Sequence, residues 1–410
     1  MENSTVVQRY VNEMINKVAL VRPDILSNKK LQSKFINNIL KNKKSFPLQV
    51  HNNYKETTSN TDSEKIMNII LDKKPCISGY GVLFKNKKQK VNVPGKIVDF
   101  IIKQRKVAKN KMLEYVNSDK AMYNKLDLEQ STYKILVNAY YGAFGEKSFH
   151  FYNPYLGPSV TYSGQHIIIS AIMAFEGLIS DNIYFFNFNE IIQFLYNCKE
   201  KEELNPDYYM GIEFTVEDLL DRYKEKCNFD LNERELEVLE KMFENASFEL
   251  REKWYFKNNL ELFIQIPEIQ ELILFMVRED FMNSEKPPED FIEPMEWLTG
   301  FILHSVGYKF QIPNKEAKVP QMKRKTILVT DTDSTFIYLD KFVEKVQEMA
   351  ERNFTIKEQI ATVNIITHIL TEFISTVFYV ICTNENVQEE DRHLVAMKNE
   401  FLFKRVMLTR

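Results

Sequence analysis

Two aspartates, two residues apart in a short polar turn, are the residues of this chain best suited to do chemistry. Asp331 and Asp333 lie in the turn Thr330–Ser334, and β-branched and aromatic residues on both sides predict a β-hairpin over residues 326–339. In extended geometry the two carboxylates project to the same side. Such a pair suits a hard divalent cation, which prefers oxygen ligands. The alternative is a solvated acidic turn, which is the commoner meaning of an isolated Asp-X-Asp.

A second polar pattern lies on a helix predicted from about Leu128 to Phe144. Lys134, Asn138 and Tyr141 recur at helical spacing and therefore share one face. A lysine, an amide and a phenol on one face could meet a phosphate, a sugar or a base edge. A solvated helix face that ends at a glycine is an equally good interpretation.

The third pattern is a strongly basic segment, residues 85–111, with nine lysines and one arginine against the single acid Asp99. It includes a helix predicted over Gly95–Val116, in which Arg105 and Lys109 share a face. A cationic helix face binds phosphate by charge, and arginine adds a two-pronged hydrogen-bond donor. Generic basic faces are common. So large a local excess in a chain of net charge −3 nevertheless argues for a polyanionic ligand.

The order of these motifs resembles that of family B DNA polymerases. Residues 104–109 resemble the fingers helix that grips the incoming triphosphate. The sequence KILVNAYYG at 134–142 resembles the KxxxNSxYG motif, with Ala139 in place of serine. DTDS resembles the YGDTDS palm motif, although residues 329–330 are Val-Thr rather than Tyr-Gly. Residues 159–165 resemble the start of the palm helix in phage members, and residues 393–400 resemble a later palm strand.

This resemblance implies a role for each candidate residue. Asp333 would be the principal metal ligand and Asp331 its auxiliary, with Glu400 near the metals. The triphosphate would be held by Arg105, Lys109, Lys134 and Asn138, while Tyr141 would shape the pocket of the nascent base pair. The implied reaction is attack of a primer 3′-hydroxyl on the α-phosphate of a dNTP, with two Mg²⁺ ions bound at the site.

Parts of the family pattern have no counterpart in this sequence. The aspartate of the DxxSLYP motif is not found before the fingers, and no 3′–5′ exonuclease region or thumb is recognised. We therefore expect a split polymerase of viral or phage type. A second polypeptide would supply the exonuclease and the aspartate, and another stretch or chain would supply the thumb. The alternative is a non-catalytic, degenerate polymerase subunit that acts as a scaffold or DNA-binding module. RNA synthesis also stays open, because the residue that excludes ribose lies in the missing motif.

The expected fold class is α+β, with an antiparallel palm sheet and flanking helices, two-helix fingers and a large helical insertion. The insertion has no family counterpart and could be a scaffold or a docking site for a partner chain or duplex DNA. Within it, Asn232–Trp254 is predicted to be one charged helix with Leu236, Leu239 and Met242 inward. The expected division is 1–76 (irregular, linking to the palm), 77–145 (fingers), 146–181 (palm helix), 182–322 (insertion) and 323–410 (palm with the DTDS hairpin).

The rest of the chain supports simpler predictions. We expect a helix over 6–21, a polar loop over 52–63, a strand over 77–84 and a last strand near 394–403. The apolar run at 373–382 is too short to span a bilayer. The four cysteines form no CxxC pair, which argues against zinc and for a reducing compartment. We therefore expect an intracellular protein, in the host cytoplasm, that binds primer–template DNA and no membrane.

Overall fold

In the computed structural model the chain forms two compact units. The smaller unit comprises residues 45–166 and 383–391, and the larger unit comprises 1–44, 167–382 and 392–410. The structure describes residues 15, 26–41, 47–52, 57–86, 93–179, 191, 214–226, 231–256, 264, 267–277, 289–305, 324–331 and 334–397.

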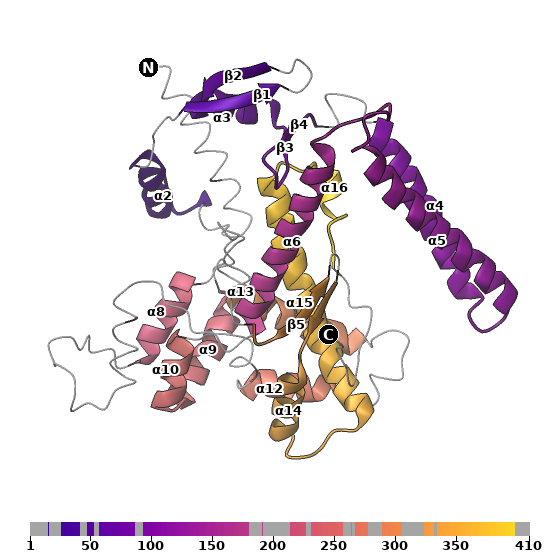
Figure 1. The fold of residues 1–410 in the computed structure, drawn as a ribbon. Helices are drawn as coiled ribbons and strands as arrows, with labels where there is room; N and C mark the ends of the chain where they lie inside the picture. The colour runs from indigo at the N-terminus through magenta and orange to yellow at the C-terminus, as the bar shows by residue number, and fades with distance from the viewer. Residues whose placement is uncertain are drawn as a thin grey trace. The chain divides into compact units, whose positions relative to one another are not determined.

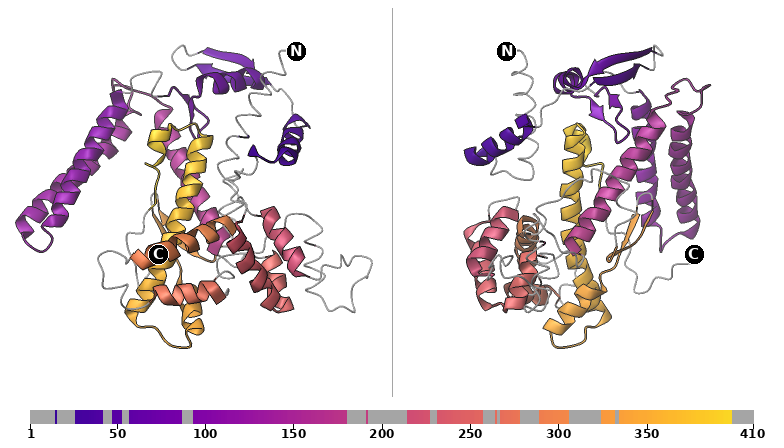
Figure 2. Two further views of the ribbon diagram at one scale, coloured as in Figure 1. Left: turned by 180° about the vertical axis from the view of Figure 1, so that it is seen from behind. Right: turned by 60° about the vertical axis from the view of Figure 1, so that its left-hand side comes forward.

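Two long helices that lie side by side dominate the smaller unit (Figures 1 and 2). They are α4 (Val93–Glu114) and α5 (Lys120–Ala143). Their seam buries Ile101, Ala108 and Met112 of α4 and Leu126 of α5. Helix α4 begins beside Pro94, as predicted, because proline is favoured in a first helical turn.

Helix α5 begins well before the predicted Leu128. The carboxylate of Asp119 accepts hydrogen bonds from the backbone N–H groups of Ala121 and Met122, at 2.9 and 3.0 Å. An aspartate at this position satisfies N–H groups that have no partner within the helix. The helix therefore starts at Lys120, directly after the turn that follows α4.

The strands of the smaller unit correct two predictions. The sequence predicts a loop over residues 52–63, but half of this stretch is β2 (Thr57–Asp62), which pairs antiparallel with β1 (Pro47–Asn52). Its threonines are β-branched and suit a strand without being apolar. The single strand expected over 77–84 is instead β3 (Cys76–Ile77) and β4 (Leu83–Phe84), joined by a turn in which Gly81 has φ +79°. Helix α3 (Ser63–Lys73) connects the two pairs of strands.

Helix α6 (Leu156–Ile179) begins in the smaller unit and ends in the larger one. The larger unit also contains two short strands that form a hairpin, β5 (Ile327–Asp331) and β6 (Ser334–Ile337). Its other described helices are α2 (Lys29–Lys41), α8 (Val216–Lys226), α9 (Glu233–Asn245), α10 (Phe248–Phe256), α12 (Pro267–Met276), α13 (Glu289–Ser305), α14 (Asp340–Met349) and α15 (Ile356–Asn384). Helix α16 (Glu389–Arg392) is a single turn near the end of the described chain.

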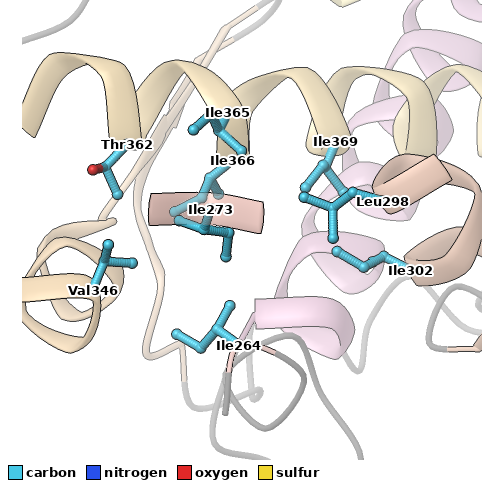
Figure 3. A pocket seen from close by; sticks show the side chains of 9 residues that line it. All are labelled: Ile264, Ile273, Leu298, Ile302, Val346, Thr362, Ile365, Ile366 and Ile369. Carbon is cyan, nitrogen blue, oxygen red and sulfur yellow. The ribbon is translucent and has the colours of Figure 1, made fainter. Parts of the chain in front are cut away.

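One hydrophobic core joins the described insertion helices to the elements around the β5–β6 hairpin. Buried side chains from α9, α12 and α13 belong to the same cluster as those from α6, β5, α14 and α15. Figure 3 shows where Ile273 of α12, Leu298 of α13, Val346 of α14 and Ile366 of α15 meet around a cavity of only about 10 Å³. A cavity of that size is about one water molecule, so the helices pack closely. The described part of the insertion is therefore continuous with the core beneath the hairpin.

The single helix predicted over 232–254 is two helices. Helix α9 ends at Asn245, where Ala246 takes an extended ψ of 142°, and the hydroxyl of Ser247 accepts a hydrogen bond from the N–H of Leu250 at 3.3 Å as α10 begins. A serine at a helix start stabilises a new first turn. Leu239 and Met242 are buried as predicted, and Leu236 is partly buried.

The apolar run at 373–382 is part of a longer element than predicted, the 29-residue helix α15. Threonine and serine side chains of this helix donate to backbone carbonyls one turn earlier, as Thr371 does to Thr367 at 2.7 Å and Ser375 does to Thr371 at 2.7 Å. The hydroxyls therefore do not interrupt the helix. Among the described residues, α15 alone has the length and composition to cross a membrane, but 56% of its most apolar 18-residue stretch is buried within the protein. The core helix of a globular domain has the same properties.

Other predictions are tested only in part. Of residues 6–21, only Ile15 is described, and it is helical. Residues 394–397 form a turn and irregular chain rather than a strand, and 398–403 lie outside the described residues. Each sheet in the described chain has two antiparallel strands, so a larger palm sheet and the α+β class stay predictions.

Candidate active site

The predicted aspartate hairpin is present as β5–β6. Asp331 is the last residue of β5 and pairs with Ser334, while Thr330 pairs with Thr335 one step further from the turn. β-branched and aromatic residues form both strands, as the sequence indicated. The side chain of Asp331, and Asp333 and Glu400 altogether, lie outside what the structure describes.

The donor chemistry of this hairpin fits Mg²⁺. A strand that ends in an aspartate, with a second aspartate in the following turn, supplies the carboxylate oxygens that Mg²⁺ prefers. Asp331 and Asp333 would hold the ion, with Glu400 as a further candidate. No group of three or more histidine, cysteine, aspartate or glutamate residues could hold a metal elsewhere in the part of the chain that the structure describes.

Arg105 lies half-buried at the seam between α4 and α5. Its Nε donates a hydrogen bond to Oε1 of Gln130 at 3.4 Å, and Gln130 in turn donates to Oδ1 of Asp127 at 2.9 Å. A guanidinium has five N–H donors, of which this bond uses one. Asp127 therefore positions the amide of Gln130, which in turn orients the guanidinium of Arg105. Sequence reasoning missed both partners, because neither stands in a recognised motif.

Lys109, Lys134 and Asn138 are exposed on the same pair of helices. Lys109 follows the seam residue Arg105 by four residues, and Lys134 follows the seam residue Gln130 by four. In an antiparallel pair, equal rotations away from the seam carry both side chains to the same flank. Asn138 lies one further turn along that stripe. We call this surface, made of Arg105, Lys109, Lys134, Asn138 and Tyr141, the basic flank.

Tyr141 has a structural contact that its motif did not indicate. Its hydroxyl donates to the carbonyl of Gly157 at 2.9 Å and shares a hydrogen bond with Oγ1 of Thr161 at 2.7 Å. Both partners lie at the start of α6, in or beside the segment 159–165. The hydroxyl thus ties the end of α5 to α6, while the tyrosine side chain remains 39% exposed.

The start of α6 is held from a second side by the β3–β4 turn. The N–H of Gly79 donates to Oγ of Ser163 at 2.9 Å, and Tyr80 stacks on Tyr162 with ring centroids 5.1 Å apart. A Cβ at position 79 would lie 2.9 Å from the carbonyl oxygen of Tyr162, so glycine is required for this approach. The first turns of α6 therefore have fixed contacts with both α5 and this turn.

The basic flank and the aspartate hairpin belong to different units. The flank lies in the smaller unit and β5–β6 in the larger one. That the two surround one nucleotide stays a prediction.

Comparison with known proteins gives two family matches. Residues 33–209 match the family model described as DNA polymerase family B, and residues 302–410 match the one described as Divergent Family B DNA polymerase. The chain is also 29% identical over 165 residues to DNA polymerase 1 of Sulfolobus acidocaldarius. That alignment covers 40% of this chain and 16% of the archaeal protein, so the chain spans only a small part of this relative. No solved structure matches the chain significantly.

The motifs fall inside the matched segments. Helices α4 and α5 lie in the first, and the β5–β6 hairpin lies in the second, whereas residues 210–301 lie outside both. The resemblance indicated by the order of the motifs is thereby confirmed at the level of the family. This chain is similar to family B DNA polymerases over two separate segments, the second of the divergent type.

Proposed function

We propose that this chain forms the fingers and part of the palm of a family B DNA polymerase that transfers a nucleotidyl group from a dNTP to a primer 3′-hydroxyl. The observation that carries the proposal is the basic flank, whose cationic and amide side chains come from two helices locked together at the seam. The two family matches, which contain the flank and the aspartate hairpin respectively, support it further.

The basic flank has the chemistry to bind a triphosphate. Lys109 and Lys134 neutralise phosphate charge, and the donors of Arg105 that remain after its bond to Gln130 can bind phosphate oxygens. The amide of Asn138 can bond the sugar or a phosphate. In phosphoryl transfer the protein contributes mainly positioning and charge, which is what such a surface provides.

Asp331 and Asp333 would hold Mg²⁺ at the hairpin. Two such ions, when bound, stabilise the attacking and leaving oxygens of the displacement. The contribution of the chain would be to present these carboxylates from one short hairpin, whose strand β5 begins at the buried Ile327.

A complete site needs a further carboxylate. On this proposal, a second polypeptide supplies the aspartate of the DxxSLYP motif and the exonuclease, and another stretch or chain supplies the thumb. The assembly would work on primer–template DNA in the cytoplasm of a host cell, as in viral or phage replication. The interface would be large and partly apolar, since it must complete a sheet.

A non-catalytic role is the second candidate. The match of residues 302–410 is to a divergent branch of the family, and the DxxSLYP aspartate is not found in the sequence. A degenerate subunit that keeps the fold to bind DNA or to support a partner would have both features.

Primer extension by the chain assembled with its native partners separates the two candidates. We expect Asp333→Ala to lower synthesis by roughly a thousandfold or more, because residues that act as one unit in catalysis are not individually replaceable. Asp340→Ala removes an exposed aspartate at the start of α14 and serves as the matched control with unchanged synthesis. Undiminished extension by Asp333→Ala would assign the chain to the non-catalytic class.

A further inference from the structure

A carboxylate buried in the core of the larger unit has no part in the chemistry described above. Glu176 of α6 is only 1% exposed, and its neighbours on the helix, Ala174, Phe175 and Leu178, are all core residues. Removing a carboxylate from water costs several kcal/mol unless hydrogen bonds compensate. The partners of Glu176 therefore show what the buried charge is for.

Its partners include three consecutive backbone N–H groups at the start of β5. Oε1 of Glu176 accepts from Ile327 at 2.8 Å, from Thr326 at 3.0 Å and from Lys325 at 3.2 Å. Oε2 also accepts from the N–H of Lys325 at 3.2 Å. The bonds join segments that are about 150 residues apart in the sequence.

Three successive N–H groups cannot point at one acceptor in a regular strand, where they alternate in direction. The chain is accordingly bent at Lys325 and Thr326, β5 begins at Ile327, and its pairing with β6 has one register irregularity between Ile327 and Val329. Concave runs of N–H groups of this kind attract anions. The carboxylate therefore fixes the point at which the chain turns into β5.

Thr326 also connects the start of β5 to the chain that follows β6. The carbonyl of Thr326 accepts a hydrogen bond from the N–H of Tyr338 at 2.8 Å, at the end of β6. Ile327 is itself buried in the core. The base of the hairpin is thus held by α6 on one side and by its own pairing on the other.

We propose that Glu176 is a positioning residue for the aspartate hairpin, and that its carboxylate sets the register with which β5 presents Asp331. Asp331 is four residues from Ile327 along β5, beyond the register irregularity between Ile327 and Val329, so we expect the position of the base to set how the strand continues to Asp331. A slip of one residue would turn Asp331 to the opposite face of the hairpin. The link from register to metal binding rests on the proposed polymerase function, whereas the link from Glu176 to register does not.

A matched pair of variants tests the proposal. Glu176→Gln keeps one carbonyl acceptor but loses the charge, and Glu176→Ala loses both. Glu358→Gln is the control, because Glu358 is also a buried carboxylate of the larger unit but bonds to Arg352 and Thr355 rather than to β5.

The first measurement is hydrogen–deuterium exchange over residues 324–331 in the full chain. Relative to core amides of α13, we expect exchange at Thr326 and Ile327 to rise about tenfold in Glu176→Gln and further in Glu176→Ala, with no relative change in Glu358→Gln. Unchanged exchange in both Glu176 variants would overturn the proposal, whether or not the chain polymerises DNA.

The second measurement is the Mn²⁺ dependence of primer extension by the assembled enzyme. Glu176→Gln is expected to raise the half-saturating Mn²⁺ concentration severalfold, whereas Glu358→Gln leaves it unchanged. An equal rise in both variants would reduce Glu176 to a general stabilising role and overturn the proposal. Absence of extension by the wild-type assembly would count against the polymerase function instead, and the exchange data would still decide the role of Glu176.

Discussion

Large apolar side chains are exposed on one part of this molecule and buried in another. On α4, Phe100 is 60% exposed, and Ile102, Val107 and Leu113 are also exposed. In the larger unit, Phe301 of α13 is fully buried at 0% in a core that includes side chains from α6, α12, α14 and α15. The packing of α4 against α5 is therefore confined to one narrow seam. The larger unit is instead stabilised by a core to which many of its elements contribute.

This difference fits the tasks that we assign to the two parts. A pair of helices joined at one seam leaves its flanks accessible, so charged and amide groups can line a surface for a ligand. A densely packed unit instead provides a fixed base, on which a short hairpin can hold carboxylates in register. The three predictions that follow test this contrast, in order of decreasing effect.

The largest effect is expected from a phenylalanine in the core. Phe301→Ala should lower the free energy of unfolding of the larger unit by about 3–5 kcal/mol, because it removes buried area and leaves a cavity. Phe100→Ala on α4 should change stability by about 0.5 kcal/mol or less. Both tryptophans, Trp254 and Trp297, lie in the larger unit, so urea unfolding followed by tryptophan fluorescence measures the loss in Phe301→Ala, and amide exchange along α4 measures the loss in Phe100→Ala. Equal losses in the two variants would remove the contrast.

An intermediate effect, dependent on pH, is expected at Glu358. The Arg352 guanidinium, with the backbone N–H of Thr355, lowers the pKa of Glu358 from 4.5 to about 2. Between pH 4.5 and about 2 the unfolded chain therefore binds a proton that the folded chain does not, so this stabilisation is present above pH 4.5 and is lost as the pH falls toward 2.

Glu358→Gln should accordingly lower the free energy of unfolding at pH 7 by about 1–3 kcal/mol. The difference from wild type should shrink as the pH falls below 4.5, as measured by urea unfolding at a series of pH values. A difference that stays constant down to pH 2 would show that the charge of Glu358 is not what stabilises the start of α15.

The smallest effect is expected at the end of the α4–α5 pair. Tyr141→Phe removes the hydroxyl that forms hydrogen bonds with Gly157 and Thr161. It should lower the free energy of unfolding of the smaller unit by about 0.5–1.5 kcal/mol. Because the seam itself is untouched, the loss should appear as faster amide exchange in the last turn of α5 and the first turn of α6. Thr161→Val removes one of the same bonds and should have part of the effect. Exchange that rises equally along all of α5 would mean that Tyr141 supports the whole pair.

Elements with a strong local pattern could be predicted from the sequence. The β5–β6 hairpin follows from β-branched residues around a polar turn, and α4 follows from Pro94 and a long helical pattern. The start of α5 was misplaced because it depends on one capping side chain, Asp119. Strand β2 was missed because its pairing with β1 uses backbone hydrogen bonds, whereas the prediction relied on apolar side chains.

The candidate site could be predicted only as far as its motifs extend. The charges of the basic flank stand out in the sequence, but the bond from Arg105 to Gln130 depends on how two helices pack. The contact of Glu176 with Thr326 joins segments that no local pattern relates. Such long-range partners orient the site and become apparent only when the chain is folded.

The central proposal is that residues of the basic flank and carboxylates of the aspartate hairpin bind the same metal-bound nucleotide. Iron-mediated cleavage of the assembled protein tests this directly, with Fe²⁺ in place of Mg²⁺, a dNTP and peroxide, because hydroxyl radicals cut the backbone near the bound ion. We predict dNTP-dependent cuts both near 331–334 and near 134–141, and loss of both sets in Asp331→Asn. Cuts at the hairpin without any on α5 in the presence of dNTP would contradict the account.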